Sequence, residues 1–322
     1  MAARRHMAER QRRRGWRIRD QGTDLRRGRN RDRPRISGRC PNEYQRNVAS
    51  VAALTGGGFV VSWESEEGED RSGTGVSARI FEASGAAAGP EFLVNTETTN
   101  HQLAPSVAAL ADGGFVVTWA SRDGLDDPDG FGIKARIFDA SGAAAGPDFL
   151  VNAETGDHQT VPSVTALADG GFVVTWHSRD GVDDPDGFGI KARIFDASGN
   201  VVGSEFLVNE ETYGTQALPA VTALADGGFV VTWDGVDRDI RARIFDASGD
   251  AVTSEFRVNE DASFVQTGSS VSALPDGGFV VTWTTTVDAE DGSGYAVRAR
   301  IFDADGTPSV PATPGTDANT AS

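Results

Sequence analysis

The chain has 322 residues and a formal net charge of −17, which is long enough for one large or two modest domains. Residues 1–40 hold 15 of the 30 basic side chains and four acids, so residues 41–322 carry a net charge of −28. A body this acidic repels nucleic acid and anionic membranes and attracts cations. The single cysteine, Cys40, excludes an intrachain disulfide, and no stretch is apolar enough to span a bilayer.

Residues 1–33 form a basic segment with too few apolar side chains to build a core, so we expect a disordered tail. The segment lacks the apolar run of a Sec signal peptide. A basic arm for nucleic acid is the alternative interpretation, but nothing downstream resembles a nucleic-acid-binding module. We therefore predict no nucleic-acid partner and no membrane insertion.

The main feature of the remaining chain is a repeat, marked by the phrase GGFVV(T/S)W. Its five tryptophans lie 56, 57, 57 and 50 residues apart, and they are Trp63, Trp119, Trp176, Trp233 and Trp283. A period of about 57 residues indicates a repeat architecture. The repeats lie near residues 42–98, 99–155, 156–212, 213–262 and 263–306.

The second repeat shows what each copy contains. We expect strands at Ser106–Leu110, Phe115–Trp119, Ile133–Asp139 and Phe149–Asn152. Asp112-Gly113 predicts a two-residue hairpin turn, and Gly142 has the position of a positive φ angle in a second turn.

Four short strands without helical periodicity make one antiparallel sheet that cannot bury both of its faces alone. The sequence therefore predicts an all-β fold of five four-stranded antiparallel repeats, stacked as a five-bladed β-propeller. An open piece of a longer array is the competing interpretation.

The two ends of the array indicate how a ring could close. In the fifth repeat, a Pro/Thr/Ala-rich tail at residues 307–322 stands where the other repeats have the fourth strand. Counting back seven residues from Gln45 places residues 34–37 at a fourth-strand position. We therefore predict one domain over residues 34–306, in which an N-terminal strand completes the last sheet and removes its exposed edge.

The phrases LADGGFVVTW, DGxGIxAxxFDASG and EFxVN resemble a repeat of very large bacterial secreted and surface proteins of the RTX-like, type I secreted, adhesin kind. The resemblance covers about residues 42–306. It implies an extracellular or cell-surface location, a calcium-rich setting and a binding or structural role. The chain lacks the calcium-binding nonapeptide GGxGxDxUx, so calcium would have to bind elsewhere.

Two nearly identical acidic loops are the candidate calcium sites, because each places four carboxylates within seven residues between flexible glycines. Their carboxylates are Asp123, Asp126, Asp127 and Asp129 in the second repeat and Asp180, Asp183, Asp184 and Asp186 in the third. The alternative is a solvated acidic hairpin. Calcium is the only cofactor that we predict.

The residues that recur in every copy favour structural roles. We expect the tryptophans in the core, the arginine before each Ile-Phe paired with an acid of the same or the next sheet, and the EFxVN asparagines bonded to the backbone.

No Ser-His-Asp spacing or phosphate loop is present, and almost nothing except loop length distinguishes the copies. We therefore predict a non-enzymatic extracellular binding or structural module, with a cell-surface glycan or protein as partner. A propeller lectin is the alternative, and a glycosidase or sialidase-like propeller is the third candidate. The oligomeric state stays open.

Overall fold

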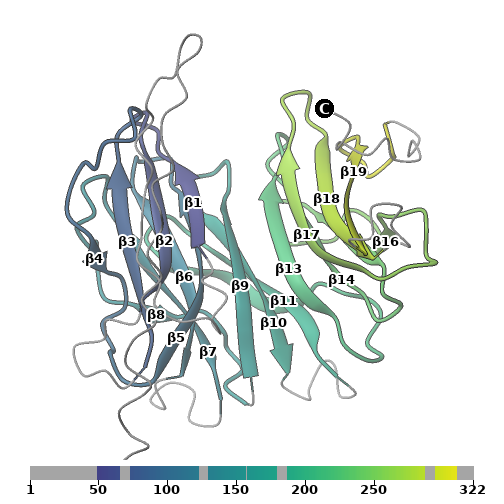
Figure 1. The fold of residues 1–322 in the computed structure, drawn as a ribbon, viewed down its shortest axis with the longest axis horizontal. Helices are drawn as coiled ribbons and strands as arrows, with labels where there is room; N and C mark the ends of the chain where they lie inside the picture. The colour runs from purple at the N-terminus through teal and green to yellow at the C-terminus, as the bar shows by residue number, and fades with distance from the viewer. Residues whose placement is uncertain are drawn as a thin grey trace, which may run out of the picture. The chain divides into compact units, whose positions relative to one another are not determined.

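The computed structural model describes residues 49–65, 73–122, 130–156, 158–179, 187–286 and 294–309, and all of its regular elements are β-strands (Figure 1). The compact unit that holds them runs from Ile36 to Ser322. Among the described residues, no helix could span a bilayer. The strands form five antiparallel sheets, numbered here in chain order.

Each sheet is built from strands that follow one another in the chain. Sheet 1 contains β1 (Ala49–Ala53), β2 (Phe59–Ser65), β3 (Gly75–Phe81) and β4 (Phe92–Leu93). Sheet 2 contains β5 (His101–Ala109), β6 (Phe115–Arg122), β7 (Gly132–Phe138) and β8 (Phe149–Leu150). Sheet 3 contains β9 (His158–Ala166), β10 (Phe172–Arg179), β11 (Gly189–Phe195) and β12 (Val201–Leu207). Sheet 4 contains β13 (Ala217–Ala223), β14 (Phe229–Asp234), β15 (Ile240–Phe245) and β16 (Phe256–Arg257). Sheet 5 contains β17 (Gln266–Ala273), β18 (Phe279–Thr286) and β19 (Tyr295–Phe302).

The strands bear out the predicted meander, with small differences in length. In sheet 2 the first strand begins at His101, and the fourth strand ends at Leu150. The first hairpin differs from the predicted two-residue turn, because Gly113 N donates to Leu110 O and the central residues are Ala111 and Asp112. Gly113 follows with φ +96°, a conformation that costs glycine little.

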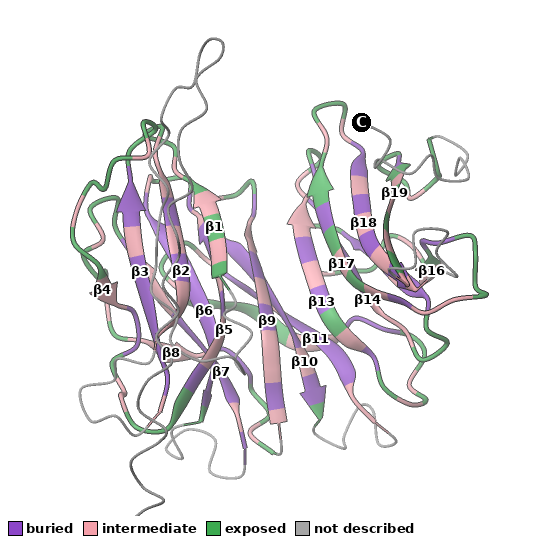
Figure 2. Ribbon diagram, in the orientation of Figure 1, coloured by how far each residue is buried: buried purple, intermediate pink, exposed green. Residues whose placement is uncertain are grey.

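The core lies between successive sheets. Four apolar clusters each join two neighbours: sheets 1 and 2, 2 and 3, 3 and 4, and 4 and 5. The first strands of successive sheets also contact one another, in the order β1, β5, β9, β13, β17. Figure 2 accordingly shows β6 and β10 largely buried. Each sheet therefore buries its faces only by stacking on its neighbours, and the fold is the predicted β-propeller.

The recurring side chains hold these junctions together. Trp119, Trp176 and Trp233 are fully buried, as predicted. Asn95 Oδ1 accepts a hydrogen bond from Val76 N at 2.8 Å, and the later asparagines repeat this bond to the backbone.

The predicted arginine pairing needs a correction, because the main partner is a backbone carbonyl of the preceding sheet. Arg136 Nη1 donates to Val94 O at 2.9 Å, and Arg193, Arg243 and Arg300 make the equivalent bond. The acids that form ion pairs with these arginines also belong to the preceding sheet. Glu210 pairs with Arg243, and Glu260 pairs with Arg300, each at 2.7 Å.

Candidate functional site

One position breaks the repeat: the residue that follows each tryptophan, near the end of the second strand. The five occupants are Glu64, Ala120, His177, Asp234 and Thr284. Three of these five residues are ionisable, whereas the tryptophan before them recurs in every copy.

Glu64 bridges two sheets from the end of β2. Its Oε1 atom accepts a hydrogen bond from Ala104 N in β5 at 2.8 Å. Burial raises the pKa of the Glu64 carboxyl, and the bond from Ala104 opposes this effect only in part. The carboxyl group is therefore protonated at a higher pH than an exposed glutamate.

Asp234 makes the same kind of bridge from β14 to β17. It accepts hydrogen bonds from Gly268 N at 3.0 Å and from the Thr267 hydroxyl. Burial raises the pKa of Asp234 more than these donors lower it. Two repeat-breaking carboxyl groups thus share an elevated pKa for the same physical reason.

His177 is the third ionisable group at this position. Burial lowers its pKa to about 4, so the imidazole is neutral at physiological pH. Its ring lies 4.2 Å from the Phe188 ring, measured between centroids, and its Nε2 atom has no hydrogen-bond partner in the part of the chain that the structure describes.

The first strands of sheets 2 to 5, which include the strands that donate to Glu64 and Asp234, have unusual backbone conformations. Ala104, Val161 and Leu218 have φ angles of 52°, 52° and 53°, and Gly268 has 67°. In all four of these strands a register shift against the second strand marks the position as a β-bulge. A β-branched residue such as Val161 rarely adopts positive φ, and strain of this kind clusters at functional positions.

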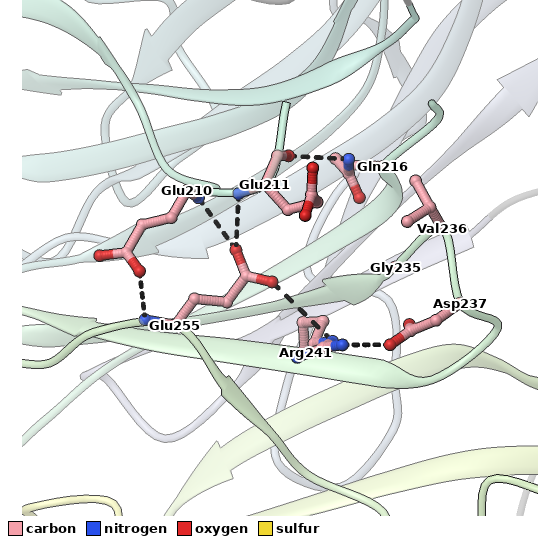
Figure 3. Close-up of a pocket in the computed structure, with 8 residues that line it drawn as sticks. All are labelled: Glu210, Glu211, Gln216, Gly235, Val236, Asp237, Arg241 and Glu255. Atoms are coloured by element: carbon pink, nitrogen blue, oxygen red, sulfur yellow. Dashed lines mark hydrogen bonds and ion pairs between the residues drawn. The ribbon is translucent and has the colours of Figure 1, made fainter. Parts of the chain in front are cut away.

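A cavity of about 440 Å³ lies where sheet 3 meets sheet 4 (Figure 3). It is lined by Glu210, Glu211, Gln216, Gly235, Val236, Asp237, Arg241 and Glu255. In Figure 3, Arg241 lies between Glu255 and Asp237 and pairs with both. Glu210 N donates to Glu255 Oε2 at 2.9 Å, and Glu255 N donates to Glu210 Oε2 at 3.2 Å.

These carboxylates already make structural hydrogen bonds and ion pairs at the sheet junction. The acid before the fourth-strand phenylalanine makes the same bond at earlier junctions, where Asp148 accepts from Thr96 N and Glu205 accepts from Ala153 N. The cavity is thus part of a repeated junction, and the position after the tryptophan is the better candidate site.

The eight predicted calcium-binding aspartates lie outside the described residues, at 123–129 and 180–186. The described residues contain no group of three or more acidic, histidine or cysteine side chains suited to a metal ion. The calcium sites therefore stay a prediction.

The comparisons with known proteins concern the fold. No protein-family model matches the chain, and no curated protein matches its sequence. A solved protein of unknown function from Dyadobacter fermentans is similar over 81% of this chain and 79% of its own, with TM-score 0.57 and 14% identity. An alpha-L-arabinofuranosidase from Lactobacillus brevis is similar over 83% of this chain and 95% of its own, with TM-score 0.50 and 11% identity. The Hadza microbial sialidase Hz136 is similar over 78% of this chain and 55% of its own, with TM-score 0.51 and 10% identity. At such identities the similarity establishes the fold.

The sequence-based prediction that the chain is not an enzyme is contradicted by these similarities, because two of the structures described above are named as enzymes. That prediction rested on the premise that only loop length distinguishes the copies. Glu64, His177 and Asp234 show that the premise was wrong. The signal was present in the sequence, since an alignment of the five repeats on their tryptophans exposes the variable position directly.

Proposed function

We propose that this propeller acts on carbohydrate and cleaves glycosidic bonds. The observation that carries the proposal is the pair of partly buried, repeat-breaking carboxyl groups of Glu64 and Asp234, whose pKa values are raised by burial. Glycoside hydrolysis uses two carboxyl groups, one of which must stay protonated near neutral pH to donate to the leaving oxygen. The named enzymes among the similar folds, an arabinofuranosidase and a sialidase, support a glycoside as the substrate class.

Glu64 and Asp234 have the roles of acid and base in this proposal, and His177 is a neutral polar group at the equivalent position of sheet 3. Elevated carboxyl pKa values suit proton transfer, because catalysis is most efficient when the pKa lies near the working pH. The resemblance of the repeats to those of RTX-like secreted and surface proteins supports an extracellular or cell-surface location, with glycans as the partner class.

The test is hydrolysis of aryl glycosides, including an α-L-arabinofuranoside and a sialoside, by the full chain. Glu64→Gln and Asp234→Asn should each lower kcat by about 10²–10⁴. Both substitutions keep an oxygen that can accept from Ala104 N or Gly268 N, so the melting temperature should change little. Glu154→Gln, at an exposed acid, is the matched control and should retain activity.

Each outcome of this test has a meaning. Turnover that survives both substitutions would remove Glu64 and Asp234 from the reaction. Binding of glycans without any turnover would favour the lectin alternative, and neither turnover nor binding would overturn the proposal.

A further inference from the structure

The four junctions between neighbouring sheets share one plan, in which the fourth strand of the earlier sheet seals the contact. Its phenylalanine packs on the phenylalanine that ends the third strand of the next sheet. The ring centroids are 5.4 Å apart for Phe92 and Phe138 and 5.8 Å apart for Phe256 and Phe302. The valine that follows offers its carbonyl to the next arginine, as Val94 does to Arg136.

Sheet 1 has an exposed face of the kind that the later sheets bury. The equivalent first-strand valines Val107, Val164 and Val221 are 6–8% exposed, whereas Val51 is 65% exposed. The side chains of Phe59 and Trp63 on the same face are also more exposed than their fully buried counterparts in sheets 2 to 4. This face is the one that sheets 2 to 5 each pack against the sheet before them.

Sheet 5 has the complementary exposed face. Val297 of β19 is 78% exposed, whereas its counterparts Val76, Ile133 and Ile190 are fully buried. Ile301 is 38% exposed, against 3% for Ile194. These apolar side chains are exposed on the opposite face from the one that sheet 1 exposes. Exposed apolar side chains that the other sheets bury indicate an interaction surface.

The third strand of sheet 5 is also an open edge among the described residues. In sheets 1, 2 and 4 a two-residue fourth strand pairs with the third strand, as Leu93 pairs with Ser77. After β19 the described chain makes a bridge between Phe302 and Pro308 and a bond from Ser309 N to Ile301 O, and no described strand pairs with the rest of β19. An unpaired edge of this kind is a template for an added strand.

We propose that Ile36–Gly38, which lies outside the described residues, pairs with β19 as the fourth strand of sheet 5 and seals sheet 5 against sheet 1. The spacing of the chain supports this occupant. The fourth-strand asparagine precedes a glutamine of the next first strand by seven residues at every junction, for example from Asn95 to Gln102. Seven residues before Gln45 is Gly38, and this places Ile36 opposite Arg298 in the register that joins Leu93 to Ser77.

A further observation favours this segment over a second copy of the chain. Among the described residues, a second copy offers no spare strand, because its fourth strands are already paired within sheets 1 to 4. The segment lacks the usual phenylalanine and asparagine, so it completes the edge with fewer side-chain contacts than the other fourth strands make.

A disulfide trap on the full chain tests the pairing. In a Cys40→Ser background, Ile36→Cys with Arg298→Cys should form an intramolecular disulfide on mild oxidation. The matched control, Ile36→Cys with Arg241→Cys, should not, because Arg241 already faces Arg257 of its own fourth strand. Disulfide-linked dimers would show that a second copy supplies the strand and would overturn the proposal, and so would equal trapping at both positions.

Thermal melts provide a second readout. Deleting residues 1–40 should lower Tm by at least about 3 °C, whereas deleting residues 1–33 should leave it unchanged. Replacing Ile36-Ser37-Gly38 by Leu-Val-Asn should raise Tm, because an asparagine at 38 can accept from Val297 N as Asn95 accepts from Val76 N. The swapped variant Ser37→Asn with Gly38→Val should not raise it. Identical melts for both deletions would count against the segment.

Discussion

At the scale of the residue, His177 couples stability to pH. Burial lowers its pKa to about 4 from 6.5, so the unfolded chain binds the proton more tightly than the folded one. The contribution of the neutral His177 to the stability of the fold is complete above pH 6.5 and is lost as the pH falls toward 4.

His177→Ala copies the residue of sheet 2, Ala120, and should remove this dependence. The loss of stability between pH 6.5 and 4 should be smaller in the variant by up to about 3 kcal/mol. Urea unfolding at a series of pH values measures it. Parallel pH profiles for the two proteins would show that His177 does not titrate in this window.

The tryptophans give a second prediction at this scale. Trp119 Nε1 donates to Gln102 Oε1 at 3.0 Å, and Trp176 and Trp283 donate to their glutamines in the same way. Trp233 Nε1 is buried without a partner in the described part of the chain, and Gln216 Nε2 donates to the carbonyls of Glu211 and Tyr213.

Trp233→Phe should therefore destabilise the protein less than Trp119→Phe. Both side chains are fully buried and lose the same apolar area, but only Trp119→Phe breaks a hydrogen bond and removes the donor to Gln102 Oε1. The difference should be about 1–2 kcal/mol in the free energy of unfolding. Equal losses in urea titrations would mean that Trp233 has a partner in solution.

At the scale of the element, the acidic loops that follow β6 and β10 are predicted to bind calcium. If they do, calcium should raise Tm more than magnesium at equal ionic strength, because magnesium demands tighter octahedral geometry and holds its water. Asp127, Asp129, Asp184 and Asp186, all changed to Asn, should abolish this difference while the fold persists.

The control for the loop variant must remove the same number of negative charges from positions outside the loops. Glu82, Glu91, Glu154 and Asp250 are exposed and lie outside both loops, so converting them to amides gives the same change of net charge. This variant should keep its specific response to calcium. Equal responses to calcium and magnesium in the parent protein would leave the loops as solvated hairpins.

At the scale of the whole molecule, repulsion among the acidic side chains is the main effect that destabilises the fold. Residues 41–322 carry a net charge of −28, and this self-repulsion destabilises the compact state. Raising NaCl from about 0.02 M to about 0.5 M should therefore raise Tm by a few degrees, since the Debye length falls from about 20 Å to about 4 Å. The variant with four neutralised exposed acids should respond less. A Tm that falls with salt would show that ion pairs such as Arg300–Glu260 outweigh the repulsion.

The sequence by itself determined the repeated architecture. The period of the tryptophans, the apolar FVV strands and the turn glycines at Gly113 and Gly142 act within one sheet, so local spacing was enough to predict four-stranded antiparallel units and buried tryptophans. A sheet with two apolar faces must stack, and the propeller followed from that requirement.

Only the tertiary structure decided how the sheets are joined and how far the repeat-breaking carboxyl groups are withdrawn from solvent. Arg136 bonds to a carbonyl 42 residues away, and Glu64 bonds to an amide 40 residues away. Such contacts depend on how one sheet lies on the next, which spacing within a repeat does not encode. The raised pKa values of Glu64 and Asp234 likewise depend on burial at these junctions, because an equally spaced acid on an open strand would stay solvated.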